Sequence, residues 1–405
     1  MSISKYAYRE DCAHRVLGVL KHFEGLLDMP VFVAIDVRQG DAIFMEKEER
    51  TLLVDGGNSA RTFPKRFVKC TGRKHVDVLV CTHSEADHAR GVLGFLKGSC
   101  TADQVWLPAS WTKRLADLIS DPIGFFKESV KDIGQLEENV VTDLETLSEM
   151  FSERQYEKDD AIFEADVNSF GAEHTHHYQS HALNEFLRSS IIPERRDKRS
   201  RLMIEAVIAA DVIKEITLAA YRSGSCIRWF EYIGGRQQTK PTGGIKHFLV
   251  PVNCTELSRI RYRSSMSALE YIALTRANRE SLTFVSPRDS ISPGVLFTSD
   301  SDLSFRQTIP WSKEMIVTAP HHGSENNRRA YQRFRSETMN SFNVTWVRSD
   351  RPTRSKGGRP GKSYTSMNSR YCTVCRGPIW SYQIVKLSAS SNSSWRPVKT
   401  RKCRC

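Results

Sequence analysis

Three short apolar runs, far apart in the chain, each lead into side chains that can bind a metal ion. These runs are residues 76–81 before His83, residues 295–298 before Asp300, and residues 315–318 before His321 and His322. Short apolar runs are typical of strands buried in a sheet. Ligands at strand ends meet only when the strands end at the same edge of a sheet, so this pattern strongly constrains the fold.

The first of these segments is rich in metal-binding side chains. Residues 83–88 read His-Ser-Glu-Ala-Asp-His. Imidazole and carboxylate groups are the ligands that borderline and hard divalent metals prefer. Taken singly, such a segment is also typical of a solvated loop, Asp300 of a turn, and the two late histidines of a surface pair. Their coincidence at three strand ends favours a metal site.

Strand patterns occur in two groups towards the ends of the chain, with charge-rich helical patterns between them. The strand patterns fall at residues 31–37, 42–45, 51–54, 76–81, 105–107, 247–252, 282–285, 295–298, 315–318 and 344–347, and the main helical ones at 135–151 and 202–220. This order predicts one α/β domain over residues 1–350, with a mostly helical insertion at about 112–245. Residues 351–405 would form a basic C-terminal extension.

The positive charge of the chain is concentrated in that extension. The formal net charge is +12, and residues 351–405 contain thirteen Lys or Arg and no Asp or Glu. Residues 1–350 are therefore close to neutral, and the extension favours a polyanion such as DNA or RNA as partner. The sequence has no run of eighteen apolar residues and no signal-like N-terminus, which predicts a cytoplasmic protein without a membrane partner.

The ten cysteines fall into two groups. Six are scattered singly, which is typical of reduced thiols rather than of a disulfide framework. The other four form a Cys-x2-Cys pair and a Cys-x-Cys pair near the C-terminus, at Cys372, Cys375, Cys403 and Cys405. Four thiolates could complete a structural zinc site, and the alternative is a disordered basic tail with incidental thiols.

The order of the motifs resembles the metallo-β-lactamase superfamily, and within it the ComEC-type hydrolase domain of bacterial DNA-uptake proteins. That branch opens with Asp-Val-Gly-Gln-Gly-Asp-Ala, and residues 36–42 read Asp-Val-Arg-Gln-Gly-Asp-Ala. Its motif Thr-His-x-(His/Asp)-x-Asp-His-x-x-Gly matches residues 82–91, with Glu85 where His or Asp is usual. The Asp-x-Gly, Asn-x-x-Ser-Leu, Gly-Asp and Pro-His-His-Gly-Ser motifs have counterparts at residues 55–57, 278–282, 299–300 and 320–324.

This resemblance implies the αβ/βα sandwich of the superfamily and one or two divalent metal ions, zinc or manganese, with catalysis resting on Asp87 and Asp300. One ion would be held by His83 and Glu85, and the other by Asp87 and His88. Asp300 would bridge the two ions.

Two more residues receive roles from the same alignment. His322 corresponds to the late histidine ligand, with His321 as the second choice. Asp55 would orient a ligand rather than bind metal.

Two departures accompany the resemblance. Arg38 replaces a glycine, and no histidine between residues 91 and 281 clearly corresponds to the middle metal ligand. The candidates for that ligand are His174, His176, His177, His181 and His247. The expected function is a metal-dependent hydrolase, a phosphodiesterase or nuclease acting on DNA or RNA. The alternative is a nucleic-acid-binding or signalling subunit with a degenerate metal site.

Overall fold

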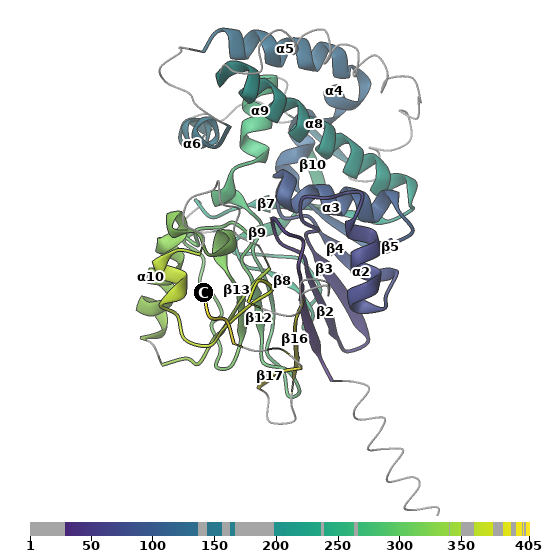
Figure 1. Cartoon of the computed structure of the whole chain (residues 1–405). Coiled ribbons are helices and arrows are strands. Elements are labelled where there is room, and N and C mark those ends of the chain that lie inside the picture. The colour runs from purple at the N-terminus through teal and green to yellow at the C-terminus, as the bar shows by residue number, and fades with distance from the viewer. Residues whose placement is uncertain are drawn as a thin grey trace, which may run out of the picture.

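The computed structural model describes residues 29–136, 144–155, 163–166, 198–235, 239–262, 266–339, 341–349, 360–375, 384–389, 394–398, 400 and 402–405. Two sheets lie face to face in the lower part of the molecule, and a group of helices covers their upper end (Figure 1). Within the described part of the chain, none of the helices combines the length and the apolar character needed to cross a bilayer.

The larger sheet has nine strands. In spatial order they are β17 (Trp395–Pro397), β16 (Ile384–Ala389), β1 (Val31–Ile35), β2 (Ile43–Lys47), β3 (Arg50–Val54), β4 (His75–Val80), β5 (Thr101–Pro108), β7 (Cys226–Tyr232) and β9 (Cys254–Glu256). Strands β3, β4, β5 and β7 run parallel to one another, and the other neighbours are antiparallel. The carboxyl ends of β3 and β4 therefore lie at one edge of this sheet.

The smaller sheet has six strands. Their order is β15 (Arg370–Cys372), β14 (Thr345–Arg348), β13 (Ile316–Thr318), β12 (Val295–Phe297), β11 (Phe284–Ser286) and β8 (Val250–Pro251). Strands β12 to β15 are parallel. Parallel strands buried on both faces read as continuous apolar runs, which is why residues 295–298 and 315–318 stand out in the sequence.

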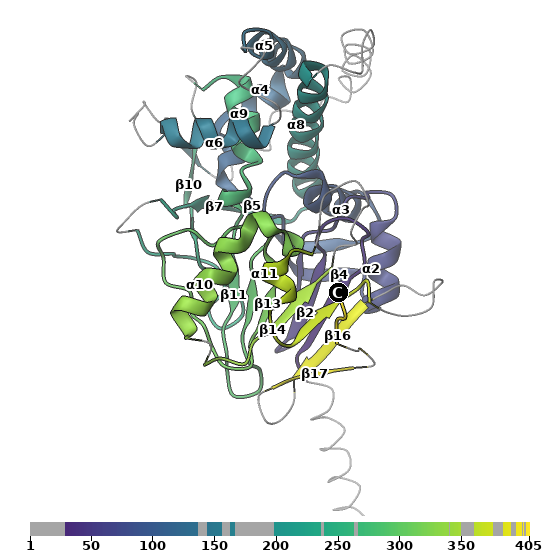
Figure 2. The same cartoon turned by 60° about the vertical axis from the view of Figure 1, so that its left-hand side comes forward.

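The two sheets pack through a core of large apolar side chains. Trp106 and Phe230 from the larger sheet meet Phe284 from the smaller one, with ring centroids 4.8–5.5 Å apart. Helices α2 (Phe63–Thr71) and α3 (Ala86–Lys97) cover the outer face of the larger sheet (Figure 2). Helices α10 (Arg328–Thr338) and α11 (Lys362–Thr365) cover the smaller sheet. The expected α/β sandwich is confirmed.

A helical cap lies over one end of the sandwich (Figure 1). It contains α4 (Leu115–Ser120), α5 (Pro122–Gly134), α6 (Leu144–Gln155), α8 (Lys198–Arg222) and α9 (Ala268–Thr275), preceded by the turn η1 (Ala109–Arg114). A two-stranded sheet joins β6 (Phe163–Asp166) to β10 (Arg259–Tyr262). Helix α9 is tied to the turn η1 by Tyr271, whose hydroxyl donates to the carbonyl of Trp111 at 2.7 Å.

The predicted insertion, residues 112–245, extends too far in one respect. Strand β7 lies inside that range but pairs in parallel with β5, so it belongs to the larger sheet. Its sequence carries a charged residue on each face, with Arg228 bound to Glu256 of β9 on the face of buried Phe230, and Glu231 on the face of buried Trp229. These charged residues interrupt the continuous apolar run that marks its neighbours, so the sequence pattern does not separate the strand from the insertion.

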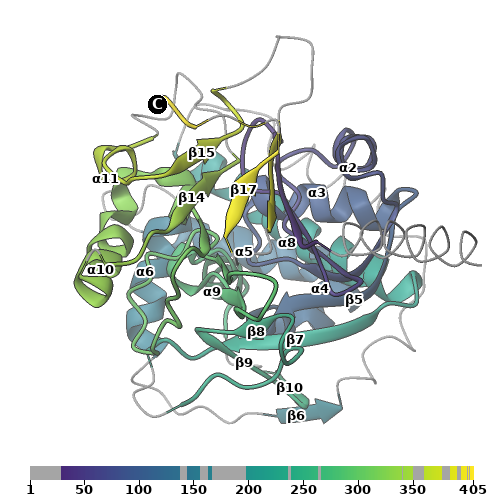
Figure 3. The ribbon, with the colours of Figure 1, turned by 90° about the horizontal axis from the view of Figure 1, so that it is seen from below.

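The basic extension contributes strands to both sheets. Strand β15 extends the smaller sheet beside β14, and β16 pairs with β1 at the edge of the larger one (Figure 3). Trp395 of β17 is buried, and its indole nitrogen donates to the carbonyl of Pro293 at 3.1 Å. The division at residue 350 stays a prediction from the sequence, and the described residues beyond it are part of the sandwich.

Candidate metal centre

The three predicted strand ends meet at one edge of the sandwich. The loops after β4, β12 and β13 bring His88, Asp300 and His322 together, and all three side chains are buried. A fourth loop, between β1 and β2, reaches the same place. Gly40 in that loop has a φ of +94°, and a Cβ there would lie 1.5 Å from the carbonyl oxygen of Asp87. Glycine therefore permits the close approach of this loop to the β4–α3 turn.

Backbone strain is concentrated in the same loops. Asp55, Ser299, His321 and His322 all have positive φ, between 45° and 58°. Such conformations are costly for residues with a Cβ, and they persist where the surrounding structure enforces them, often at functional sites. Here they turn the side chains at the strand ends toward a common point.

Asp300 lies at the centre of the cluster. Its Oδ1 is 3.2 Å from His88 Nε2 and 3.4 Å from His322 Nε2. Its Oδ2 is 3.6 Å from His321 Nε2 and 3.9 Å from His83 Nε2. Both oxygens of Asp300 are buried and, among the described residues, accept no hydrogen bond. A buried carboxylate between four imidazoles has the position expected of a bridging ligand.

The distances among three of these atoms fit a shared ion. His88 Nε2 and His322 Nε2 are 3.2 Å apart, which completes a triangle with Asp300 Oδ1. Nitrogen and oxygen ligands at about 2.0–2.2 Å from one tetrahedral ion are separated by about 3.3–3.6 Å. Asp87 Oδ2 lies beside this triangle, 3.7 Å from His322 Nε2. The donor atoms of His88, His322 and Asp300, together with one of Asp41, all lie within 4.8 Å of one another, which fits one divalent metal.

Each of the two imidazoles in that group also faces a second carboxylate. His88 Nδ1 lies 2.8 Å from Asp55 Oδ2, and His322 Nδ1 lies 3.3 Å from Asp41 Oδ1. A carboxylate at Nδ1 fixes the ring orientation and leaves Nε2 as the donor to a metal. Asp55 is itself held by the backbone nitrogen and hydroxyl of Thr82, at 2.9 and 2.8 Å. Asp55 and Asp41 are therefore suited to position the ligands.

The other half of the cluster contains His83, Glu85 and Asp300, whose donor atoms lie within 4.8 Å of one another. His83 Nε2 is buried without a hydrogen-bond partner among the described residues. Glu85 is partly exposed and forms an ion pair of 3.2 Å with Arg276, which follows helix α9. Arg276 also lies 3.6 Å from Glu205 of α8, so the helical cap borders this half of the centre. Because Glu85 is paired with Arg276, the His83 half of the cluster has fewer donors available to a metal than the His88 half.

The electrostatics of the cluster favour a bound cation. Burial favours the neutral form of Asp300, yet His322, His88 and His321 together hold the pKa of Asp300 well below its usual value. Burial disfavours the charged form of His88 and His322, but Asp300 with Asp55 or Asp41 raises the pKa of His88 strongly and that of His322 to about 9. The buried carboxylates thus require positive charge beside them, and a divalent ion can supply it.

His83 behaves differently from the other imidazoles. Burial and the neighbouring His88 lower the pKa of His83 below its usual value. The side chain is then neutral at physiological pH, which is the form of histidine that binds metals.

Two donor groups share Asp300: His83 and Glu85 belong to one, and His88, His322 and Asp41 to the other. The predicted residues Asp87 and His321 lie beside these groups, 3.7 Å from His322 Nε2 and 3.6 Å from Asp300 Oδ2. The candidates for a middle histidine are not among them. His247 is exposed, and its carbonyl accepts a hydrogen bond from Lys47, at the opposite end of β2 from Asp41. The other four, His174, His176, His177 and His181, lie outside the described residues.

Sequence reasoning assigned no role to Asp41, although it belongs to the motif at residues 36–42. Its neighbour Gly40 was the available signal, because a glycine before an aspartate in a ligand-rich chain is typical of a tight loop at a site. Ser349, after β14, was also missed; its hydroxyl donates to Asp41 and to the carbonyl of Gly40.

Comparison with known proteins agrees with this geometry. A family model described as the metallo-beta-lactamase superfamily matches residues 35–145, which include the β4–α3 turn with His83, Asp87 and His88. The comparison with curated proteins finds no match. The ComEC-type likeness stays a prediction from the motifs. Over residues 35–145 the chain is similar to the metallo-beta-lactamase superfamily, and this similarity together with the candidate metal site implies a metal-dependent hydrolase.

Proposed function

We propose that the protein is a metal-dependent phosphodiesterase that acts on DNA or RNA. The observation that carries this proposal is the charge pattern at the centre. Two exposed arginines, Arg38 and Arg328, are each adjacent in sequence to a residue that contacts the acidic cluster. Hydrolysis of a phosphodiester uses a metal site for the reaction and cationic side chains that bind the phosphate oxygens.

Each of the two arginines adjoins one such contact in the sequence. Exposed Arg38 precedes Gln39, whose side-chain nitrogen donates to Asp87 Oδ2 at 3.4 Å. Exposed Arg328 follows Asn327, whose side-chain nitrogen donates to the carbonyl of Asp300 at 2.8 Å. A guanidinium matches the geometry of a phosphate through two parallel hydrogen bonds. The arginine at position 38, which departs from the glycine of the related motif, is then a substrate-binding feature.

The residues of the centre divide the work between them. Asp87, His88 and His322 would hold one metal together with Asp300, and His83 with Glu85 would hold a second one. A bound divalent metal supplies a water of lowered pKa and polarises the scissile group. Asp55 and Asp41 keep the two imidazoles in the orientation that presents Nε2 to the centre.

The choice of metal follows from the donors. Glu85 replaces a position where imidazole is common in the resembling branch, which makes the His83 half richer in oxygen. Oxygen donors favour manganese over zinc relative to an imidazole set. The ion pair with Arg276 weakens this half further, so activity with a single metal at the His88 half is expected at low metal concentration.

The basic extension supports a nucleic-acid substrate rather than a small diester. In the part of the extension that the structure describes, the exposed Lys and Arg side chains include those of Lys362, Arg396 and Lys402. Lys362 begins α11, Arg396 lies in the edge strand β17, and Lys402 precedes Cys403, and we propose that they contact a long polyanion while the centre holds one phosphate. Phosphate contacts by such residues make the affinity depend steeply on salt.

The alternative function, a nucleic-acid-binding or signalling subunit with a degenerate site, is favoured by one observation. Arg276 neutralises Glu85, a residue that would otherwise bind metal. Under this alternative the protein binds DNA or RNA without metal-dependent turnover.

The test is an assay of the purified full chain against DNA, RNA and the small diester bis-p-nitrophenyl phosphate, with manganese or zinc added after chelation. Metal-dependent cleavage of all three supports the proposal. Arg38→Gln and Arg328→Gln should raise KM for nucleic acid several-fold and leave metal content unchanged, whereas Arg222→Gln, at an exposed end of α8, should change neither. Tight binding of nucleic acid without turnover under any metal would favour the alternative.

A further inference from the structure

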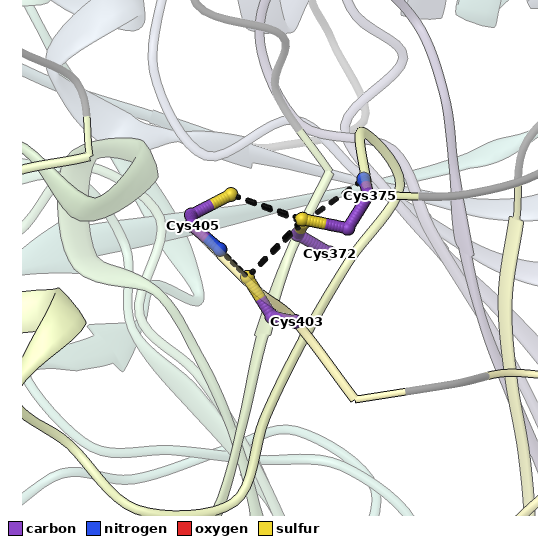
Figure 4. A group of neighbouring side chains, drawn as sticks. All are labelled: Cys372, Cys375, Cys403 and Cys405. Atoms are coloured by element: carbon purple, nitrogen blue, oxygen red, sulfur yellow. Dashed lines mark hydrogen bonds between the residues drawn. The ribbon is translucent and has the colours of Figure 1, made fainter.

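Cys372, Cys375, Cys403 and Cys405 form a second cluster, separate from the main centre (Figure 4). Cys372 ends β15, and Cys375 follows three residues later. Cys403 and Cys405 lie at the end of the chain, and Cys403 is held to β15 by a hydrogen bond of 2.7 Å from its backbone nitrogen to the carbonyl of Arg370. Two segments separated by a stretch of chain therefore converge on one point.

The distances between the sulfur atoms exclude disulfides and fit a metal. Cys375 Sγ lies 3.2 Å from Cys405 Sγ and 3.7 Å from Cys403 Sγ. Cys372 Sγ lies 3.3 Å from Cys403 Sγ and 3.6 Å from Cys405 Sγ, and all four sulfurs lie within 4.8 Å of one another. A disulfide bond is about 2.05 Å long. Four thiolates at about 2.3 Å from a zinc ion are about 3.8 Å apart, close to the separations here.

Backbone amides point at the sulfurs. The nitrogens of Cys375, Arg404 and Cys405 donate to the sulfurs of Cys372, Cys375 and Cys403 at 3.3–3.4 Å. Such donors stabilise thiolates in the same way that hydrogen bonds stabilise any charged acceptor. Incidental thiols in a tail would not have amides donating to three of their four sulfurs.

Charge around the cluster has the sign that a tetrathiolate requires. Zinc with four thiolates carries a net charge of −2. The guanidinium of Arg348, a fully buried residue of β14, lies 3.9 Å from Cys405 Sγ, and Arg370, Lys402 and Arg404 lie on the two segments that carry the cysteines. Cys372 and Cys403 are themselves buried.

We propose that Cys372, Cys375, Cys403 and Cys405 bind one structural zinc ion that fastens the C-terminus to strand β15. Four protein ligands leave no open position, so this ion has no part in hydrolysis. The ion would add four bonds to the hydrogen bond that Cys403 makes with β15.

The zinc site also supports one wall of the main centre. Thr373, inside the Cys372–Cys375 loop, donates through its hydroxyl to the carbonyl of Ser349 at 2.8 Å. The hydroxyl of Ser349 in turn donates to Asp41, which faces His322. The loop that the zinc orders is therefore two hydrogen bonds from the carboxylate that positions a ligand of the main centre.

The experiment is metal analysis of the full chain by inductively coupled plasma mass spectrometry, on protein purified under reducing conditions. We expect one zinc per chain that survives mild chelation and survives Asp300→Ala, which disables only the main centre. Cys375→Ser should lose this zinc. Cys226→Ser, a matched change at an exposed cysteine of β7, should keep it.

A second measurement covers the case in which Cys375→Ser does not fold. Wild-type protein reconstituted with cobalt should show intense thiolate-to-cobalt charge-transfer absorption in the near ultraviolet, and titration with an organomercurial should release zinc as four thiols react. Zinc-free wild-type protein, absence of these bands, or full zinc retention in a folded Cys375→Ser variant would each overturn the proposal.

Discussion

The two ligand clusters of this protein differ in how they are assembled and in what they offer a metal. The main centre draws nitrogen and oxygen donors from loops between Asp41 and His322, on both sheets. The cysteine cluster draws four sulfurs from two short segments, with backbone amides donating to them. The main centre has partly exposed Glu85 on one side, and exposed arginines follow or precede residues that contact it. The donors of the cysteine cluster are all cysteine sulfurs.

This difference separates a reactive site from a structural one. A catalytic metal keeps a position for water or substrate, while a structural metal is enclosed by four protein ligands. In the main centre the ligands are also held from behind, by Asp55 and by Asp41. Such support preserves the geometry of the ligands while one side stays open to substrate. In the cysteine cluster, the four bonds to the proposed zinc ion would fix the geometry instead.

The largest expected effect comes from Asp300→Ala. Because both oxygens of Asp300 serve the main centre, hydrolysis of a model diester should fall to the level of chelator-treated protein. Zinc at the cysteines should remain, which would show that the clusters are independent. Asp302→Ala, a nearby change outside the cluster, is the control for folding and should keep activity. Turnover well above that of the chelated protein would remove Asp300 from the catalytic set.

Asp55→Asn should have the next largest effect. Replacing a carboxylate that orients a ligand imidazole typically lowers metal affinity or activity by about 10–100-fold. Metal affinity measured by isothermal titration calorimetry should fall by this factor, while the melting temperature with metal removed changes little.

Asp41→Asn tests the same role at the other imidazole, His322. A loss of about 10–100-fold is again expected in metal affinity. If the affinity is unchanged while Asp55→Asn weakens it, Asp41 is only a packing residue and the link to the cysteine loop has no bearing on the main centre.

Glu85→His should alter the preference of the main centre for metals rather than abolish activity. An imidazole at this position restores a softer donor, so the ratio of activity with zinc to activity with manganese should rise. Arg276→Gln is the matched control, because it removes the ion pair while leaving the donor in place. An identical shift in both variants would mean that the charge of Arg276, and not the donor at residue 85, sets the preference.

The smallest expected effect concerns the basic extension. Because its strands complete both sheets, charge reversal tests it better than truncation does. Reversing Lys362, Arg396 and Lys402 to Glu should flatten the dependence of log affinity for DNA on log salt by roughly 0.7–0.9 per lost phosphate contact. Reversing Lys65, Lys69 and Lys74, three exposed lysines on or beside α2, changes the net charge equally. Equal flattening in the two variants would assign the effect to net charge alone.

The sequence predicted the α/β sandwich through the resemblance of its motifs to the metallo-β-lactamase superfamily, and its short apolar runs indicated which side chains lie at strand ends. Buried parallel strands require continuous apolar runs, and the residue after such a strand lies at the sheet edge. The apolar runs that precede His83, Asp300 and His322 therefore place these side chains at strand ends, and the arrangement of the two sheets brings those ends together. The Cys-x2-Cys and Cys-x-Cys spacings likewise marked the second cluster, although spacing could not choose between a metal site and free thiols.

The tertiary structure decided what no local pattern carries. Strand β7 carries Arg228 and Glu231 among its apolar residues, so its membership of the larger sheet shows only through its pairing with β5. Arg276 meets Glu85 across 191 residues of chain, and Ser349 meets Asp41 across 308. Contacts between such distant segments depend on how the sheets and the cap pack, and packing is a property of the whole core rather than of any one stretch of sequence.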